Sequence, residues 1–148
     1  MSECVWVSVP TGAAESLDTL VTTCNLIVTT TAARAPLIRA DLVQKGTHIT
    51  AMGSDDHGKQ ELESQLLGKA DIVVADSVSQ CVDHGECAVA IRDNQLEART
   101  ILELGNVMKN PAIGRSSDDQ ITVVDLTGVA IQDIQIAKMV DHALSMNE

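Results

Sequence analysis

Short aliphatic runs alternate with amphipathic stretches along the chain, and this alternation predicts an α/β fold. Aliphatic runs that read as strands lie at residues 4–9, 26–30, 48–52, 71–76 and 121–125. Apolar positions with helical spacing predict helices at residues 13–22, 64–67, 78–92, 100–108 and 130–145. Strands that alternate with helices form right-handed βαβ units, so we expect a mainly parallel sheet of about five strands.

Three of these helices carry more detailed expectations. The helix at 64–67 is expected to span one or two turns and to end with Gly68 at its C-cap. The stretch 78–92 is predicted as a single helix whose inward positions include Cys81. In the last helix, one face is apolar and contains Ile134, Ala137, Val140 and Leu144.

Composition narrows the classes of function. The 148 residues suffice for one domain, and no linker or repeat divides them. A formal net charge of −11 disfavours nucleic-acid and membrane-surface binding, because both partners are anionic. The sequence has one Trp, no Phe and no Tyr, so the core must be aliphatic. Four scattered cysteines, no basic leader and no apolar run of about 18 residues favour a cytoplasmic protein.

The loops that follow the predicted strands are the candidate binding segments, because ligands of open parallel sheets bind at the carboxyl ends of the strands. Thr29, Thr30 and Thr31 place three hydroxyls at the end of the second strand. Such hydroxyls can bind a ribose or an amide. Their alternative role is β-propensity and helix capping. Pro10, Thr11 and Gly12 follow the first strand, where backbone N–H groups could hold an anion.

The loop at residues 53–59 is the densest polar cluster. Asp55, Asp56, His57 and Lys59 could together serve proton transfer, or form a solvated turn. A metal site there is disfavoured, since it needs three or four convergent ligands and adjacent carboxylates point apart.

A second cluster lies in the predicted helix 78–92 and contains Cys81, Asp83, His84 and Cys87. Zinc ligation is one interpretation of this spacing. Small buried hydrophobic side chains are the favoured role for both cysteines, because the stretch is otherwise apolar and contains no second cysteine pair.

A complete dinucleotide-binding unit has G-x-G-x-x-G after its first strand and an acidic residue about 20 residues further on. This sequence has neither feature, and Gly12 is the single glycine of its first loop.

Four stretches in order resemble the C-terminal part of the ornithine cyclodeaminase/μ-crystallin family over residues 16–143. They are IVTTTAARAPLIRADLVQKGTHITAMGSDDHGKQELESQLLGKADIVVADS, QCVDHGE, ILELGNV and GRSSDDQITVVDLTGVAIQDI. The resemblance implies a Rossmann-like domain that binds NAD(P), in a dimeric protein. It also implies NAD-dependent oxidative deamination and cyclisation of L-ornithine, or related chemistry on amino and imino acids.

Site residues follow from the resemblance by position. Asp55 matches the family's acid/base beside the substrate amine, and Lys59 matches the lysine that closes the same turn. The cofactor loops correspond to Thr29, Thr30 and Thr31 and to Asp125, Thr127 and Gly128. No residue is predicted to be a metal ligand.

The family's N-terminal substrate and dimerisation domain and its glycine-rich loop have no counterpart in this sequence. We therefore expect a single truncated Rossmann-like domain over residues 1–148, which by itself binds at most a nucleotide or a small amino or keto acid. The alternative is an oligomerising interaction module, or the partner of a split or full-length relative, without catalysis. In either case we expect a homo-oligomer, and we expect strand 4–9 to pair with strand 26–30.

Overall fold

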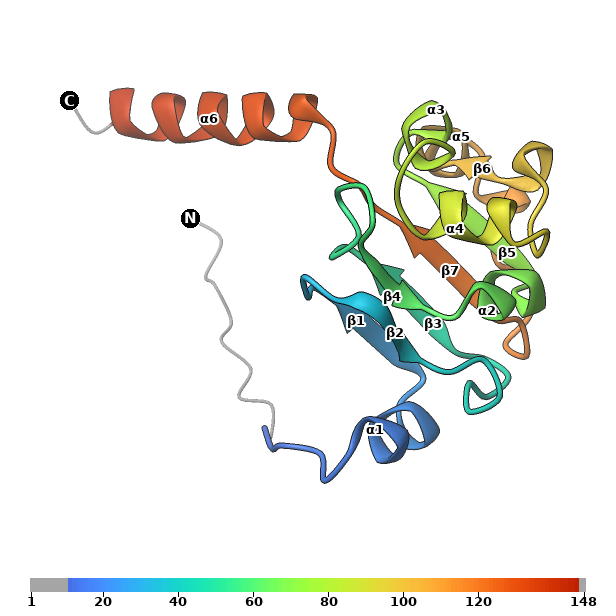
Figure 1. Ribbon diagram of the computed structural model, residues 1–148. Helices are drawn as coiled ribbons and strands as arrows, with labels where there is room; N and C mark the ends of the chain where they lie inside the picture. Colours follow the sequence, from blue (N-terminus) through green and yellow to red (C-terminus); the bar gives the residue numbers. More distant parts are fainter. Residues whose placement is uncertain (1–10, 147–148) are drawn as a thin grey trace.

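A five-stranded parallel sheet forms the centre of the protein (Figure 1). The computed structural model describes residues 11–146. In spatial order the strands are β1 (Leu26–Thr29), β3 (His48–Ala51), β7 (Thr122–Asp125), β5 (Ile72–Ala75) and β6 (Leu102–Glu103). Every neighbouring pair is parallel. The prediction of an α/β fold with a parallel sheet of about five strands is confirmed.

The core lies on one face of this sheet. Ile27, Ile49, Val123 and Val73 stand opposite one another on four adjacent strands, and all are buried. The helices α2 (Ser64–Lys69) and α4 (Glu86–Arg92) also bury apolar side chains in this core. Because side chains alternate between faces, the neighbouring Leu26 and Val28 of β1 point the other way and are exposed.

A second, two-stranded sheet pairs β2 (Arg34–Ile38) with β4 (Gln60–Leu62) in parallel. We did not predict either strand from the sequence. β2 contains Pro36, β4 has only three residues, and neither shows a long aliphatic run. Their pairing depends on tertiary contacts, and it is important because β4 carries the buried Glu61.

The first helix begins later than predicted. α1 spans Leu17–Thr23, not 13–22, because the Ser16 hydroxyl accepts a hydrogen bond from the Thr19 backbone N–H and caps the helix there. The strand predicted at 4–9, and its proposed pairing with 26–30, lie outside the described residues.

The prediction of one helix over 78–92 is wrong. The structure forms α3 (Val78–Cys81) and α4, and Gly85 separates them with φ of +105°. A Cβ on Gly85 would lie 2.7 Å from the Thr127 side chain and 2.9 Å from the Asp125 carboxylate. The break therefore requires glycine, because φ is positive and the end of β7 leaves no room for a Cβ at this point.

Two further helix predictions require correction. The stretch 100–108 contains β6 and α5 (Leu104–Lys109), preceded by a 3₁₀ turn, η1 (Ala98–Thr100). The fifth strand of the sheet is therefore β6. Gly68 lies inside α2, and Ala70 is the C-cap. The loop predicted at 110–120 contains the short 3₁₀ turn η2 (Pro111–Ile113).

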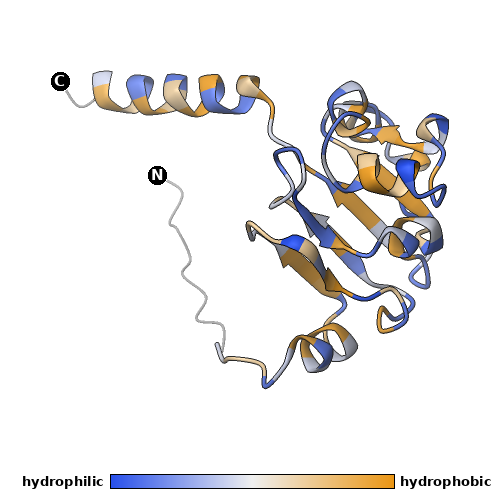
Figure 2. Cartoon of the chain, viewed as in Figure 1, coloured by the Kyte–Doolittle hydropathy of each residue, from blue (hydrophilic) through white to orange (hydrophobic). Residues whose placement is uncertain are grey.

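The last helix, α6 (Ala130–Ser145), has the predicted bounds but no buried residue. It projects from the sheet, away from the other helices (Figure 1). Ile134, Val140 and Leu144 of the predicted apolar face are 47%, 53% and 65% exposed. Apolar residues recur along the whole helix (Figure 2), and this surface contacts no element of the described chain closely enough to be buried. Within residues 11–146 no helix is long and apolar enough to cross a bilayer.

Candidate functional site

The loops that follow β1, β3, β5 and β7 meet at one edge of the central sheet, which we call the carboxyl edge. It comprises residues 30–33, 52–59, 76–77 and 126–129, together with the last residue of each strand. The strands lie in register, with Thr29 opposite Ala51 and Asp125 opposite both Ala51 and Ala75. The predicted threonine loop, the 53–59 loop and the 125–128 loop are therefore neighbours.

Glu61 of β4 links the first two of these loops through hydrogen bonds. Its carboxylate accepts hydrogen bonds from the Thr31 backbone N–H at 2.5 Å, the Thr31 hydroxyl at 2.7 Å and the Gly53 backbone N–H at 2.9 Å. The side chain is fully buried. Charge-assisted bonds of this kind are stronger than neutral ones, so the ends of β1 and β3 are held rigidly.

Glu86, the first residue of α4, supports Glu61 in turn. Its carboxylate accepts hydrogen bonds from the backbone N–H groups of Glu61 at 2.6 Å and Leu62 at 3.1 Å. Burial raises the pKa of Glu86 to about 7, although the two N–H donors act in the opposite direction. We did not single out either glutamate from the sequence. The position of Glu86 between Gly85 and an apolar stretch was the one available signal.

Asp125 ends β7 and points inward. It is 1% exposed, and its carboxylate accepts a hydrogen bond from the Cys87 backbone N–H at 2.8 Å. Burial raises its pKa to about 6. Its Oδ1 atom has no hydrogen-bond partner. The structure therefore places Asp125 against the start of α4.

The loop after Asp125 is held by two side chains from the end of β5 and from α3. Asp76 accepts hydrogen bonds from the Gly128 backbone N–H at 2.9 Å and the Thr127 hydroxyl at 3.3 Å. The Gln80 amide donates to the Thr127 hydroxyl and to the Gly128 carbonyl. Asp76 and Gln80 could not be identified from sequence pattern, because their partners lie 47 to 52 residues away.

Asp55 and Lys59 form an ion pair in the loop after β3. The hydrogen bond from Lys59 lowers the pKa of the Asp55 carboxyl group. Asp55 is exposed and therefore ionised at neutral pH, so it can accept a proton but has none to donate. This loop is also closed by a bond from the Ser54 hydroxyl to the Lys59 carbonyl at 2.9 Å.

The three threonines differ in their surroundings. Thr31 is engaged by Glu61, and Thr30 is exposed. Thr29 is 7% exposed, and its hydroxyl has no hydrogen-bond partner. Because the Thr29 hydroxyl has no exposed surface, the accessible hydroxyl at the end of β1 is that of Thr30.

The two cysteines of α3 and α4 lie in the core, as expected of small buried hydrophobic side chains. Burial raises the pKa of Cys81 to about 12, and it raises that of Cys87 further. Both groups are therefore protonated thiols at neutral pH in the metal-free chain.

A cavity of about 290 Å³ lies between the 53–59 loop and the turn that joins α3 to α4. Its lining includes His57, Lys59, Asp83, His84 and Arg92. Lys59 places this cavity beside the Asp55 pair. At the carboxyl edge, the loops held by Glu61 and Glu86 therefore lie next to a cavity and to the ionised carboxylate of Asp55.

Comparison with known proteins gives a consistent result. The model of the ornithine cyclodeaminase/mu-crystallin family matches residues 2–148. The chain is 44% identical over 126 residues to the alanine dehydrogenase of Archaeoglobus fulgidus, covering 84% of this chain and 39% of that protein. It is 39% identical over 127 residues to the iminosuccinate reductase of Paracoccus denitrificans, covering 86% and 39%. The chain thus spans about two fifths of the length of these relatives.

Solved structures of related proteins share the fold. An archaeal alanine dehydrogenase dimer with bound NAD matches with a TM-score of 0.80 and 39% identity, covering 91% of this chain and 42% of that one. The Paracoccus denitrificans iminosuccinate reductase in complex with NAD⁺ matches with a TM-score of 0.84 and 37% identity, covering 91% and 41%. The fold prediction of a Rossmann-like domain is confirmed.

The role of Glu61 generates a first prediction, for Gly53→Ala. A Cβ at this position would lie 2.5 Å from the Glu61 carboxylate and would also clash with the Thr31 carbonyl. We expect a loss of about 3 kcal/mol in the free energy of unfolding, measured by urea denaturation. Gly105→Ala is the matched control, because its Cβ would meet no atom within 4 Å, and it should be neutral or slightly stabilising. Equal stability of the two variants would contradict this account.

A second prediction concerns pH and Glu86. The folded protein keeps this proton up to a pKa of about 7, whereas the unfolded chain loses it near the ordinary value of 4.5. The contribution of Glu86 is therefore fully present below about pH 4.5 and is lost as pH rises towards 7. We expect the free energy of unfolding to fall over this range by on the order of 3 kcal/mol.

Urea denaturation at a series of pH values measures this dependence, and Glu86→Gln isolates it. The variant cannot titrate at this position, so its profile should be flatter between pH 4.5 and 7. Asp125 contributes in the same direction at lower pH, and this contribution should remain in the variant. Identical slopes for both proteins would show that Glu86 has no raised pKa.

Proposed function

This chain belongs to the ornithine cyclodeaminase/mu-crystallin family, and we propose that its carboxyl edge binds the nicotinamide cofactor of an NAD-dependent dehydrogenase or cyclodeaminase. The observation that carries the proposal is the exposed Thr30 at the end of β1, which lies on the carboxyl edge directly after the buried Thr29. The two relatives of known structure, at 39% and 37% identity, are described with bound NAD and NAD⁺. When bound, a nicotinamide cofactor supplies hydride transfer.

We assign direct contacts to the groups that are free to make them. In this assignment the exposed Thr30 hydroxyl contacts the cofactor. Asp76 and Gln80 already engage Thr127 and Gly128, so these two residues shape the neighbouring loop. Thr31 and Asp125 act indirectly, because their side chains are engaged by Glu61 and by the start of α4. Lys59 lies further along the same edge, where it holds Asp55 in the ionised form.

Asp55 is the proposed proton acceptor for an amino or imino acid substrate. Support comes from its ionised state, its place at the carboxyl edge and the cavity that Lys59 lines beside it. The substrate class follows from relatives named alanine dehydrogenase, iminosuccinate reductase and Δ¹-pyrroline-2-carboxylate reductase. Each acts on a small amino or imino acid by its name.

We propose further that the chain by itself binds but does not complete the reaction. Substrate carboxylates are usually held by Arg or Lys. Here Arg39 pairs with Asp18 and Asp41, while Arg115 is bonded to backbone carbonyls. Lys59 is paired with Asp55. Arg34 is exposed beside Gly58 of the 53–59 loop and forms no salt bridge among the described residues, so it could hold a substrate carboxylate. Any further cation would have to come from another segment or chain.

Calorimetric titration of NAD⁺ and NADH into the chain tests cofactor binding. We expect saturable binding of micromolar strength, and a loss of about tenfold or more in the Thr29→Ala/Thr30→Ala double variant, which removes both hydroxyls. Thr22→Ala is the matched control, because Thr22 is exposed on α1 and bonds within its own helix. Absence of heat at millimolar cofactor would overturn the proposal.

The exposed α6 favours a second function, which is self-association. Apolar side chains along α6 are exposed in the single chain, and exposed apolar surface of this kind usually marks an interface. One relative of known structure is described as a dimer. We propose a homo-oligomer in which the Ile134, Val140 and Leu144 face of α6 packs against a second copy of the chain.

Light scattering coupled to size-exclusion chromatography measures the oligomeric state. We expect the parent chain to be at least a dimer, and Val140→Asp to dissociate it, because a buried unpaired carboxylate is strongly unfavourable. Gln135→Asp introduces the same charge on the opposite side of α6 and should leave assembly unchanged. A monomeric parent chain, or equal effects of both variants, would contradict the proposed interface.

A further inference from the structure

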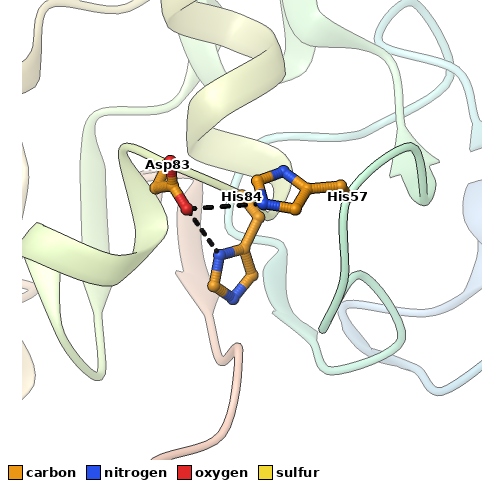
Figure 3. Close-up of side chains that lie close together, drawn as sticks. All are labelled: His57, Asp83 and His84. Carbon is orange, nitrogen blue, oxygen red and sulfur yellow. Dashed lines mark hydrogen bonds and ion pairs between the residues drawn. The ribbon is translucent and has the colours of Figure 1, made fainter.

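Two imidazoles and one carboxylate converge at the mouth of the cavity beside Asp55 (Figure 3). His57 comes from the loop after β3, and Asp83 and His84 come from the turn between α3 and α4. We propose that these three side chains bind one divalent transition-metal ion of the zinc class. His57 belongs to the 53–59 loop of the carboxyl edge, but none of the three side chains is assigned a contact with the cofactor.

The distances between the ligand atoms fit a tetrahedral ion. Zinc lies about 2.0–2.2 Å from nitrogen and carboxylate ligands, so ligand atoms around it are about 3.3–3.6 Å apart. The Asp83 Oδ2 atom lies 3.5 Å from His57 Nε2 and 3.4 Å from His84 Nδ1. All three ligand atoms lie within 4.8 Å of one another. The remaining pair of ligand atoms is the nitrogens of His57 and His84. A rotation of the exposed His57 side chain can bring these two atoms to the separation that the ion requires.

The two segments that carry the ligands are each held by their own contacts. Backbone N–H groups of Asp83 and His84 both donate to the Gln80 carbonyl, at 2.9 and 3.1 Å. His84 is 18% exposed and precedes Gly85, whose conformation is set by the end of β7. On the other side, the Asp56 carboxylate accepts from the His57 backbone N–H at 2.7 Å. Metal binding would therefore lose little conformational entropy in ordering the backbone at this site.

The donor set and the local charge indicate the kind of ion. Two imidazoles with one carboxylate suit zinc and its neighbours, whereas magnesium and calcium prefer oxygen ligands alone. The cations nearest the cavity, Lys59 and Arg92, are paired with Asp55 and Asp93, so they oppose a metal ion only weakly. With three protein ligands, a fourth position stays open for water or a ligand carboxylate on the cavity side.

Binding would join the 53–59 loop to the α3–α4 turn. These segments form opposite walls of the cavity next to Asp55. The ion would hold this opening in one conformation and add a positive charge beside it. A carboxylate-bearing small molecule is the class of ligand that such a charge attracts.

The test is zinc titration into the untagged, metal-stripped full chain near neutral pH, followed by calorimetry. We expect one equivalent to bind with a micromolar dissociation constant. His57→Ala and His84→Ala should each weaken binding about tenfold or more, since each removes one of three ligands. His142→Ala is the matched control, because this histidine lies on the exposed α6 and should not affect the titration.

Cobalt substitution separates the site from adventitious thiol binding. We expect the visible spectrum of tetrahedral cobalt without a thiolate charge-transfer band, and no change in Cys24→Ser, which removes the exposed cysteine of the described chain. Circular dichroism should show that the exposed His57→Ala variant folds like the parent. The proposal is overturned by absence of saturable binding at submillimolar zinc, by unchanged binding in His57→Ala, or by a thiolate band.

Discussion

The buried carboxylate of Glu61 is the contact on which the arrangement of the carboxyl edge depends. It accepts three hydrogen bonds from the loops after β1 and β3, and Glu86 fixes its backbone from α4. Burial of the Glu61 and Glu86 carboxylates side by side would be unfavourable if their oxygens lacked hydrogen bonds. Here backbone N–H groups donate to both carboxylates. The core and the candidate site are thus coupled, because the same residues that close the fold position the loops.

The end of β7 has a comparable effect on the opposite side of the site. A Cβ at Gly85 would clash with Asp125 and Thr127, so the break between α3 and α4 requires glycine, and Asp83 and His84 just before it line the cavity. The α3–α4 turn consequently faces the 53–59 loop across this cavity. An ionised carboxylate, a set of metal-binding side chains and the proposed cofactor loops then share one edge of the sheet, while α6 presents its apolar surface elsewhere (Figure 1).

Much of the fold could be predicted from local pattern. The aliphatic runs predicted the strands β1, β3, β5 and β7 to within one or two residues of their observed bounds. The bounds of α6 agree with the prediction at both ends. β2 and β4 escaped prediction because their pairing partners are distant and their residues are polar or include Pro36. The Thr29–Thr31 and 53–59 loops could be identified because each follows a predicted strand. In a parallel sheet the carboxyl ends of the strands meet at one edge, where ligands bind.

The sequence alone therefore determined the fold class, the family and the segments that form the carboxyl edge, because hydrophobic periodicity and loop motifs are local properties. Tertiary structure alone decided which side chains are buried there and which remain free. Glu61 and Glu86 became the supports of the site, Thr29 kept an unpartnered hydroxyl, and His57 met Asp83 and His84. Most of these outcomes depend on contacts between residues far apart in the sequence, such as Glu61 with Thr31, Glu86 with Glu61 and His57 with Asp83, which no local pattern encodes.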